Sequence, residues 1–388
     1  MAAQSSQLAE AFPAVSTPPR VLIDGRKLGD GGIGVYISNL VEGLVALGDV
    51  GVTVLSRRDR MSTLSCRDSI EWIFDGANPY SLDEYLLMPR RVDFSRYDIF
   101  HAPHYSLPFR IPIPTVVTIH DLIHIKHPER FFYPFIARPL IGSAVTRASA
   151  VIAVSRDTRD QVISETRVLA SKVRYIPNAI APFLSIPETS THDQGCIAPT
   201  EAYFLAVISN TKPHKGVEDL LNAYRSFIER HQRVRRMERP PTLKLVGFGA
   251  ERVVREGLFQ STLAGLTGVE ILGAVDAKSL RSLYQGASAL VVPSIAEGFC
   301  LPALEAQSVG TPVVCRPVPA IEELLTERDI IADDLSVRAL EMALHEAAAR
   351  ERGNRECVEA HLARFSLEAV ATQTRALYQE VIARGSGR

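Results

Sequence analysis

Residues 294–305 have the sequence Ser-Ile-Ala-Glu-Gly-Phe-Cys-Leu-Pro-Ala-Leu-Glu and join a buried strand to a helix. The apolar run 289–293 is typical of a parallel strand, and Pro302 lies where the first turn of a helix tolerates a missing N–H. The chain therefore turns near Glu297 and presents a helix N-terminus, whose free backbone N–H groups favour a phosphate. The carboxylates of Glu297 and Glu305 flank this point and can accept hydrogen bonds from hydroxyl groups. The stretch predicts a site for a ligand with both phosphate and hydroxyl groups, and a nucleotide-activated sugar fits that description.

A plainer interpretation exists, because these residue types are common at strand-to-helix turns and Glu305 would then be a solvated helix residue. However, the two glutamates are separated by seven residues that include Gly-Phe and Leu-Pro. This pattern resembles the paired-glutamate motif of retaining glycosyltransferases of family 4. The resemblance implies an α/β protein with the GT-B fold, in which two Rossmann-like domains face a central cleft and a C-terminal helix crosses back to the first domain. It also implies that Glu297 contacts the donor sugar as a catalytic residue and that Glu305 holds the ribose hydroxyls.

The composition is that of an ordinary globular protein. With 388 residues, 46% of them hydrophobic, the chain is long enough for two domains. A net charge of -1 gives no case for a nucleic-acid partner. The five cysteines show no C-x-x-C spacing, so we expect reduced residues rather than disulfides or a metal site. No uninterrupted apolar run reaches the length of a membrane span, and we expect a cytoplasmic protein, with peripheral contact at the inner face of the cell membrane left open.

Two series of alternating strands and helices divide the chain. The stretch between them is rich in Pro, Ser and Thr and has little apolar patterning, which is typical of a surface linker. The predicted division is a disordered tail (1–19), an N-terminal Rossmann-like acceptor domain (20–182), a linker (183–201), a C-terminal Rossmann-like nucleotide-sugar domain (202–365) and a C-terminal helix on the first domain (366–388).

In the first half, strands are predicted at 20–24, 52–55, 70–74, 97–101, 115–119, 151–155 and 173–178, and a helix interrupted by Pro139 at 131–149. Ligands of parallel sheets lie at the carboxyl ends of the strands, where His101, His104 and His120 occur. His101 and His104 are candidates for the acceptor side, although a lone histidine is more often packed in a core. His120 is a catalytic candidate, because Thr-Ile-His-Asp resembles the family segment whose histidine contacts the donor sugar.

A glycine-rich loop is predicted at 25–34, between the first strand and the first helix. Glycine lets a backbone approach a phosphate without a Cβ clash, although flexible loops are often glycine-rich and no G-x-G-x-x-G is present. The resemblance implies that Gly31 and Gly32 lie against the donor diphosphate and that Gly34 lies on the acceptor side.

The second half repeats the pattern, with a predicted strand at 203–208 followed by the turn 209–216. Lysines near a helix start oppose the helix dipole, which favours an external anion, although chance placement on a surface turn is an alternative. The family uses an arginine and a lysine here for the diphosphate; Lys215 matches the lysine, but Ser209 stands at the arginine position. Asn210 or Lys212 is the expected replacement. Further donor contacts implied by the resemblance are Val275, Gly298, Phe299, Cys300 and Leu301.

The resemblance implies retaining transfer of a hexose to a glycan or lipid-linked glycan in cell-surface polysaccharide synthesis. The segment 210–215 resembles that of bacterial mannosyltransferases, so GDP-mannose is the leading donor, with UDP-glucose and UDP-N-acetylglucosamine as alternatives. No Asp-x-Asp motif is present, and no metal or other cofactor is expected. A hydrolase that uses the two glutamates as a pair, a non-catalytic sugar-nucleotide or glycan binder, and a nucleotide-sugar dehydrogenase or epimerase are the competing classes.

Overall fold

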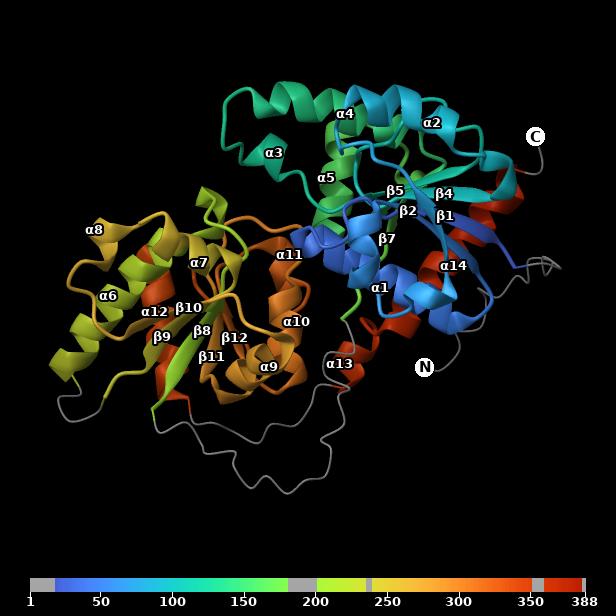
Figure 1. The fold of residues 1–388 in the computed structure, drawn as a ribbon. Coiled ribbons are helices and arrows are strands. Elements are labelled where there is room, and N and C mark those ends of the chain that lie inside the picture. Colours follow the sequence, from blue (N-terminus) through green and yellow to red (C-terminus); the bar gives the residue numbers. More distant parts are fainter. Residues whose placement is uncertain (1–17, 181–200, 235–238, 351–358, 386–388) are drawn as a thin grey trace, which may run out of the picture.

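The computed structural model describes residues 18–180, 201–234, 239–350 and 359–385, which form two α/β domains (Figure 1). The predicted tail and linker fall almost entirely outside these residues. Pro19 is an exception, because its carbonyl oxygen accepts a hydrogen bond from the Gly51 N–H at 2.9 Å. The first sheet therefore begins to pair just before the predicted start of the domain.

The first domain is built on a seven-stranded sheet with the order β3-β2-β1-β4-β5-β6-β7, and all neighbouring strands are parallel. All five residues of β5 are buried, as expected for a strand that is covered by helices on both faces. The strands are β1 Arg20–Asp24, β2 Gly51–Ser56, β3 Glu71–Phe74, β4 Ile99–Ala102, β5 Thr115–Ile119, β6 Ala150–Ala153 and β7 Val173–Tyr175.

The helices of this domain differ from the predictions at two points. They are α1 Gly31–Leu47, α2 Met88–Arg91, α3 Ile123–Lys126, α4 Tyr133–Arg147 and α5 Arg156–Thr166. Because α1 begins at Gly31, the glycine-rich loop is shorter than predicted, and Gly32 and Gly34 belong to the helix. The predicted interruption at Pro139 was wrong: α4 continues through it. Pro139 is exposed, so water can satisfy the carbonyl group that a proline leaves without a donor.

The second domain contains a six-stranded parallel sheet with the order β10-β9-β8-β11-β12-β13. Its strands are β8 Tyr203–Val207, β9 Thr242–Val246, β10 Val269–Gly273, β11 Ala289–Val292, β12 Val313–Cys315 and β13 Ile330–Ile331. Its helices are α6 Val217–Val234, α7 Phe248–Arg255, α8 Gln260–Leu263, α9 Ala277–Gly286, α10 Leu301–Ser308, α11 Pro319–Glu322 and α12 Val337–Ala349. The two sheets confirm the prediction of two Rossmann-like domains.

The chain then returns to the first domain through α13 Glu359–Ala363 and α14 Leu367–Gly385 (Figure 1). Helix α14 packs against α1. A Cβ atom on Gly43 of α1 would lie 3.0 Å from both the Ala371 Cβ and the Leu367 carbonyl oxygen, so glycine permits this close approach. The predicted crossing of the C-terminal helix is therefore confirmed.

His101 connects β4 to this terminal helix. Its side chain is completely buried, with Nδ1 2.6 Å from the Tyr378 hydroxyl of α14 and Nε2 2.8 Å from Thr118 Oγ1. Burial lowers the pKa of His101 to about 3, because the imidazolium form would lose its hydration. The ring is therefore neutral at physiological pH and holds α14 against the sheet.

This neutral histidine is expected to make the fold sensitive to acid. Below about pH 6.5 the histidine of the unfolded chain takes up a proton, whereas the folded one stays neutral down to about pH 3, so the free energy of unfolding falls as the pH drops between these values. Between pH 7 and pH 4.5 this loss is about 2 kcal/mol for one residue. In His101→Gln, urea unfolding should depend less on pH than in the wild type. The matched control is His127→Gln, at an exposed position, which should leave the difference between the two pH values unchanged.

Candidate active site

The loop from β11 to α10 carries Glu297, whose carboxylate is held by two donors. Glu297 Oε1 lies 2.6 Å from Lys215 Nζ and 2.7 Å from Ser294 Oγ. The Lys215 and Glu297 side chains are only 19% and 12% exposed. Burial alone would lower the pKa of Lys215, but the charge of Glu297 and its hydrogen bond raise it above the usual value. Lys215 is therefore a fixed ammonium group beside the turn that carries Glu297.

Glu305 is the fifth of the eight residues of α10 and follows Pro302 by three positions. Its Oε2 accepts a hydrogen bond of 2.7 Å from the Tyr284 hydroxyl of α9. Burial raises the pKa of Glu305, and the Tyr284 hydrogen bond opposes that shift only in part. Among the residues that the structure describes, no partner is recorded for Oε1, so this oxygen can accept a hydrogen bond from a ligand hydroxyl.

His120 follows β5 of the first domain. Its Nε2 lies 2.7 Å from the Pro103 carbonyl oxygen, which can only accept, so Nε2 carries the proton. Burial lowers the pKa of His120, so the ring is neutral and Nδ1 keeps a lone pair. The Tyr36 ring of α1 contacts its edge at a centroid distance of 4.9 Å, which fixes the orientation of the imidazole.

The two domains meet where His120 and the turn after Glu297 approach each other. A Cβ atom on Gly298 would lie 1.8 Å from the His120 carbonyl oxygen, so only glycine fits there. Thr158 Oγ1 lies 3.3 Å from that oxygen and 3.4 Å from the Gly298 carbonyl oxygen. A cavity of about 210 Å³ at this junction is lined from both domains, by Asp121 and Thr158 on one side and Glu297 on the other. The backbone at His120 and the turn that carries Glu297 thus meet at one interdomain site.

Gly298→Ala should therefore lower activity strongly. The added methyl group must push the turn away from His120, which we expect to cost about 1–3 kcal/mol of stability and at least about tenfold in kcat. Thermal unfolding and steady-state kinetics measure the two effects. Gly142→Ala is the control, because its Cβ would meet nothing within 4 Å. A Gly298→Ala enzyme with the kcat and Tm of the wild type would show that the close approach is dispensable.

Two further contacts hold the domains together, and no motif in the sequence indicates either of them. Lys212 Nζ lies 2.6 Å from Glu129 Oε1 of the first domain. The Glu323 carboxylate, directly after α11, accepts hydrogen bonds of 2.9 Å from the Arg156 and Asp157 N–H groups at the start of α5. A carboxylate at a helix N-terminus is favoured by the free N–H groups and the helix dipole.

Asn210 and Lys212, the candidates to replace the missing arginine, belong to a hydrogen-bonded turn. Asn210 Oδ1 accepts a hydrogen bond from the Lys212 N–H at 3.1 Å, and its Nδ2 lies 3.4 Å from Ser209 Oγ. A guanidinium that the sequence analysis missed lies behind this turn. Arg316 is fully buried, with Nη1 3.1 Å from the Pro293 carbonyl oxygen and 2.8 Å from Asp219 Oδ2. It braces β11 against the start of α6 and thereby positions the two loops that carry Glu297 and Lys215.

The other predicted donor contacts divide into backbone and side-chain cases. Gly31 and Gly32 face open space, since a Cβ atom on either would meet nothing within 4 Å. The side chains of Phe299 and Cys300 are buried in the core, so only their backbone groups can reach a ligand. Leu301 and Val275 are partly buried against the same core.

The acceptor-side predictions for His101, His104 and Gly34 need correction. Both ring nitrogens of His101 are already bonded, as described above. A Cβ atom on Gly34 would lie 2.6 Å from the Gly29 backbone nitrogen, so this buried glycine serves helix packing. His104 is buried, and its Nδ1 accepts a hydrogen bond from the Ser106 N–H at 3.1 Å. None of the three side-chain positions is open to an acceptor.

His104 belongs to a buried polar cluster at the end of β1. Ligand atoms of Asp24, Glu84 and His104 lie within 4.8 Å of one another, as three metal ligands would. However, the Arg26 guanidinium bonds Asp24 at 2.8 and 2.6 Å and Glu84 at 2.8 Å. These carboxylates already have a cationic partner, so the residues present do not fit a metal ion and the cluster is a buried ion-pair network.

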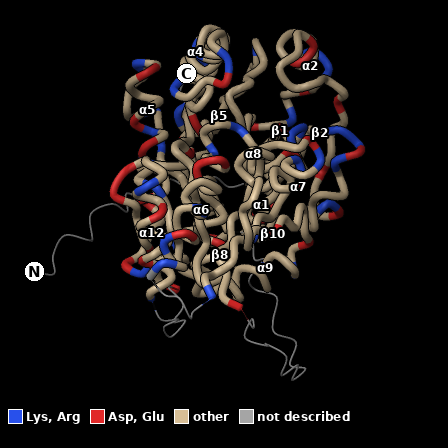
Figure 2. The backbone as a smooth tube through the Cα atoms, turned by 90° about the vertical axis from the view of Figure 1, so that its left-hand side faces the viewer, with Lys and Arg blue, Asp and Glu red and all other residues tan. Residues whose placement is uncertain are grey.

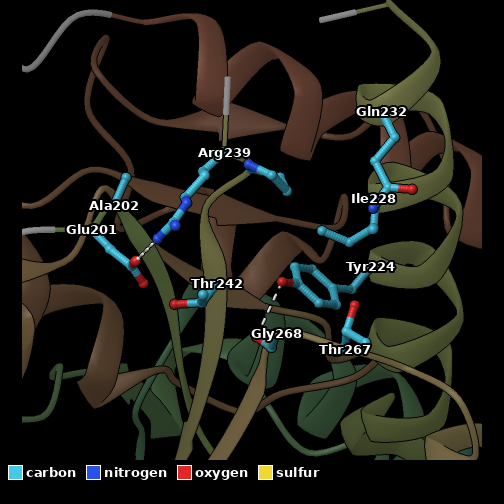
Figure 3. Close-up of a pocket in the computed structure, with 10 residues that line it drawn as sticks. Glu201, Ala202, Tyr224, Ile228, Gln232, Arg239, Thr242, Thr267 and Gly268 are labelled. Carbon is cyan, nitrogen blue, oxygen red and sulfur yellow. Dashed lines mark hydrogen bonds and ion pairs between the residues drawn. The ribbon is translucent and has the colours of Figure 1, made fainter. Parts of the chain in front are cut away.

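A separate cavity of about 440 Å³ lies at the amino ends of strands in the second sheet (Figure 3). Its lining includes Ala202, Thr242 and Gly268, which lie at or just before the amino ends of their strands. The Tyr224 hydroxyl donates to the Gly268 carbonyl oxygen at 3.1 Å, and Arg239 pairs with Glu201 (Figure 3). No predicted site residue lines this cavity, in agreement with the rule that parallel sheets bind ligands at their carboxyl ends.

The fold is that of the GT-B glycosyltransferases. Similar solved structures are HepE from Anabaena in complex with UDP and glucose (TM-score 0.67, 18% identity, covering 93% of this chain and 100% of that chain) and the lipopolysaccharide glycosyltransferase WaaG (TM-score 0.68, 14% identity, covering 92% and 99%). A sucrose-phosphate synthase from Thermosynechococcus elongatus has a TM-score of 0.66 at 22% identity, covering 94% and 99%. These likenesses establish the fold.

Family models identify the group within that fold. Glycosyltransferase Family 4 matches residues 30–182, and Glycosyl transferases group 1 matches residues 190–361. The chain therefore belongs to the family 4 glycosyltransferases. It resembles O-antigen chain mannosyltransferase B of Escherichia coli (29% identity over 325 residues, 76% of this chain and 79% of that protein). It also resembles O-antigen chain mannosyltransferase RfbU of Salmonella typhimurium (25% over 249 residues, 64% of each chain).

Proposed function

We propose that this glycosyltransferase transfers mannose from GDP-mannose, with retention of configuration, to a glycan or lipid-linked glycan during cell-surface polysaccharide synthesis. The observation that carries the proposal is the convergence of Glu297, Lys215 and His120 at the junction of the domains. Two bacterial relatives are O-antigen mannosyltransferases, which supports mannose as the sugar. A nucleotide-sugar donor is further supported by HepE, a fold neighbour whose structure contains UDP-glucose.

The ionic state of the site supports a diphosphate leaving group. Lys215 has three donor protons, and the structure uses one of them for Glu297, so a phosphate oxygen can bind beside the carboxylate without breaking the pair. A fixed ammonium group of this kind stabilises the charge that develops on the leaving diphosphate. Gly31 and Gly32 belong to the first domain, and the open space beside them can accommodate the same diphosphate.

The two glutamates take different roles in this proposal. Glu297 lies beside the cavity that both domains line, where its carboxylate accepts a hydrogen bond from the donor sugar. Glu305 lies further along α10 and accepts hydrogen bonds from the ribose hydroxyls through its unoccupied Oε1. The Nδ1 atom of the neutral His120 accepts a hydrogen bond from a hydroxyl group of the sugar. Retention follows from attack on the same face as the leaving group, with the donor phosphate taking the acceptor proton. No metal or other cofactor takes part in this scheme.

The cellular setting is part of the proposal. No helix in the described part of the chain combines the length and apolar character that crossing a bilayer requires. A cytoplasmic enzyme that contacts the inner face of the membrane peripherally would meet both a soluble nucleotide sugar and a lipid-linked acceptor.

The donor can be identified by incubating the purified protein with GDP-mannose, UDP-glucose and UDP-N-acetylglucosamine and measuring the release of nucleoside diphosphate. GDP release from GDP-mannose that increases with a lipid-linked glycan acceptor is the expected result. Release of UDP from UDP-glucose or UDP-N-acetylglucosamine would show that this nucleotide sugar, and not GDP-mannose, is the donor. Thermal stabilisation by a nucleotide sugar without any release of nucleoside diphosphate would favour a non-catalytic binder. The sequence feature that supports this alternative is Ser209 at the position where the family has an arginine. Free sugar formed without an acceptor requirement would favour a hydrolase.

A further inference from the structure

Tyr80 has a backbone conformation that is unusual for a tyrosine. Its φ angle is 64°, which lies in the left-handed region that residues with a Cβ atom rarely adopt. Tyr80 belongs to the loop that follows β3, and the residue is 42% exposed. Strain of this kind persists only where the surrounding structure holds it, and it occurs most often at binding and catalytic sites. The conformation of Tyr80 therefore indicates a function.

The buried ion-pair network described above holds Tyr80 in this conformation. The Glu84 carboxylate accepts a hydrogen bond from the Tyr80 N–H through Oε2 and pairs with Arg26 through Oε1 at 2.8 Å. Arg26 also pairs with Asp24 at the end of β1, and the side chains of all three charged residues are completely buried. Burial of charged groups is costly even when they are paired, so stability alone gives no reason for this network. We infer that it serves to fix the position of Tyr80.

Three side chains lie around the Tyr80 ring. The Lys27 ammonium group, which follows β1, donates to the Tyr80 hydroxyl at 2.8 Å and lies 4.3 Å from the ring centroid. The Tyr105 and His104 rings, which follow β4, have centroids 5.5 and 5.9 Å from that of Tyr80. His104 is buried, whereas Lys27, Tyr80 and Tyr105 are at least partly exposed. These three residues, which we call the tyrosine platform, combine accessible aromatic surface with an ammonium group.

The tyrosine platform lies beside the candidate active site. In the sheet order β1-β4-β5, its strands directly precede the one that leads to His120, and β1 and β5 lie close together in the first domain (Figure 1 and Figure 2). Because neighbouring strands are about 4.8 Å apart, the platform is roughly 5–10 Å from His120 along the sheet edge. Burial raises the pKa of Tyr105, and the charge of Asp121 raises it further. Asp121 also lines the interdomain cavity, so the platform and this cavity are neighbours.

A sugar ring fits the chemistry of the tyrosine platform. One face of a pyranose ring carries C–H groups that pack on an aromatic ring, and its hydroxyl groups form hydrogen bonds with ammonium and phenol groups. A nucleobase can also stack on tyrosine, but the proposed function assigns the nucleotide to the second domain. The positions that were expected to face the acceptor are closed, as described above, whereas Tyr80 and Tyr105 are accessible at the same edge of the sheet.

We propose that the tyrosine platform is a second acceptor subsite, which binds the sugar next to the one that receives the transferred residue. The reacting hydroxyl has to meet the donor sugar beside His120, whereas the platform begins at β4, one strand away from β5. The acceptor is therefore a glycan of at least two sugars, and a monosaccharide leaves one of the two subsites empty. The role in transfer rests on the proposed function, whereas the binding of a disaccharide at the platform does not.

Binding of disaccharides in the absence of a donor tests this subsite. Ligand-observed NMR compares mannose with mannobiose, N-acetylglucosamine with chitobiose, and glucose with cellobiose. At least one disaccharide should bind about tenfold more tightly than its monosaccharide, because one more sugar face is buried on an aromatic ring. Tyr80→Ala should remove this advantage, whereas Tyr80→Phe, which keeps the ring, should retain most of it. If no disaccharide bound more tightly than its monosaccharide, or if Tyr80→Ala kept the advantage, the proposal would be overturned.

Two further variants separate the subsite from effects on folding. Tyr80→Gly relieves the left-handed strain, so it should be at least as stable to heat as Tyr80→Ala and should still lose the disaccharide advantage. The matched control is Phe74→Ala on the edge strand β3. Phe74 is 37% exposed and also lies beside a cation, since the Arg58 guanidinium is 4.4 Å from its ring centroid, but it does not belong to the platform. This control should keep the disaccharide advantage, and its loss there would also overturn the proposal.

Nucleoside diphosphate release is measured in parallel with the same sugars as acceptors. A protein that binds a disaccharide through Tyr80 but releases no nucleotide from any nucleotide sugar would overturn the proposed function alone. Release of nucleotide with the same KM for a disaccharide and its monosaccharide would overturn the second subsite alone.

Discussion

Replacing Glu297 with glutamine is expected to lower kcat about a hundredfold or more while donor affinity changes little. Glutamine keeps the shape of the side chain but removes the charge that Lys215 and Ser294 hold in place at 2.6 and 2.7 Å. In its proposed role the carboxylate accepts a hydrogen bond from the donor sugar, and we expect this interaction to strengthen in the transition state, when positive charge develops on the sugar. Steady-state kinetics with the donor that releases nucleotide, together with calorimetric binding of the nucleoside diphosphate, separate the effect on turnover from the effect on affinity.

The control for Glu297→Gln is Glu270→Gln. Glu270 also pairs with a lysine, Lys244, at 3.0 Å, but on the second sheet outside the site. The control should keep the kcat of the wild type. Loss of stability must be monitored in both, because Lys215 is mostly buried and loses its partner, which we expect to cost about 1–3 kcal/mol. A folded Glu297→Gln enzyme that turns over within a factor of two of the wild type would refute the catalytic role.

Glu305→Ala should show the opposite division between binding and turnover. The lost hydrogen bonds to the ribose hydroxyls involve a charged acceptor, so we expect nucleotide affinity to fall about tenfold to a hundredfold. The kcat at saturating donor should fall much less. Tyr284→Phe is the control for the neighbouring contact, since it removes the 2.7 Å bond to Oε2 and leaves the carboxylate in place. If kcat fell and nucleotide affinity were unchanged, the roles of the two glutamates would have to be exchanged.

The same residue gives the site a dependence on pH. Burial raises the pKa of Glu305 above its usual value of 4.5. The carboxylate is the form that accepts hydrogen bonds, so nucleotide affinity should decline when the pH falls through this raised pKa, which is earlier than for an exposed glutamate. Measuring nucleoside diphosphate affinity between pH 8 and pH 5 tests this decline. In Glu305→Ala the affinity should depend less on pH than in the wild type.

Much of the fold was predictable because the strands are short apolar runs at regular spacing. The five residues of β5 match the predicted bounds at both ends, since Thr115–Ile119 is flanked by Pro114 and by the polar pair His120-Asp121. The strand-turn-helix around Glu297 was predictable for the same reason. The start of α1 at Gly31 was not, because glycine is usually a poor helix residue and its left-handed φ of 53° is a property of the folded backbone.

Contacts between distant segments explain the remaining errors. A histidine at a strand end can face a ligand or a neighbouring helix, and for His101 the partner is Tyr378, which comes from the other end of the chain. Nothing in the sequence distinguishes Glu129 and Glu323 from other surface acids. Their partners, Lys212 and the Arg156 N–H, lie in the other domain, so these contacts exist only once the domains have folded together. Gly34 has to be glycine because a Cβ atom there would clash with the Gly29 backbone. The spacing of apolar residues in the sequence does not reveal this contact.

The position of α14 has a consequence for biosynthesis. All seven strands of the first sheet are translated before the second domain begins, yet the partner of His101 is Tyr378, which is translated after that domain. During synthesis the surface of α1 that packs against α14 therefore stays uncovered until α14 has left the ribosome. A premature stop codon just ahead of α14 should damage the half of the polypeptide that was made first.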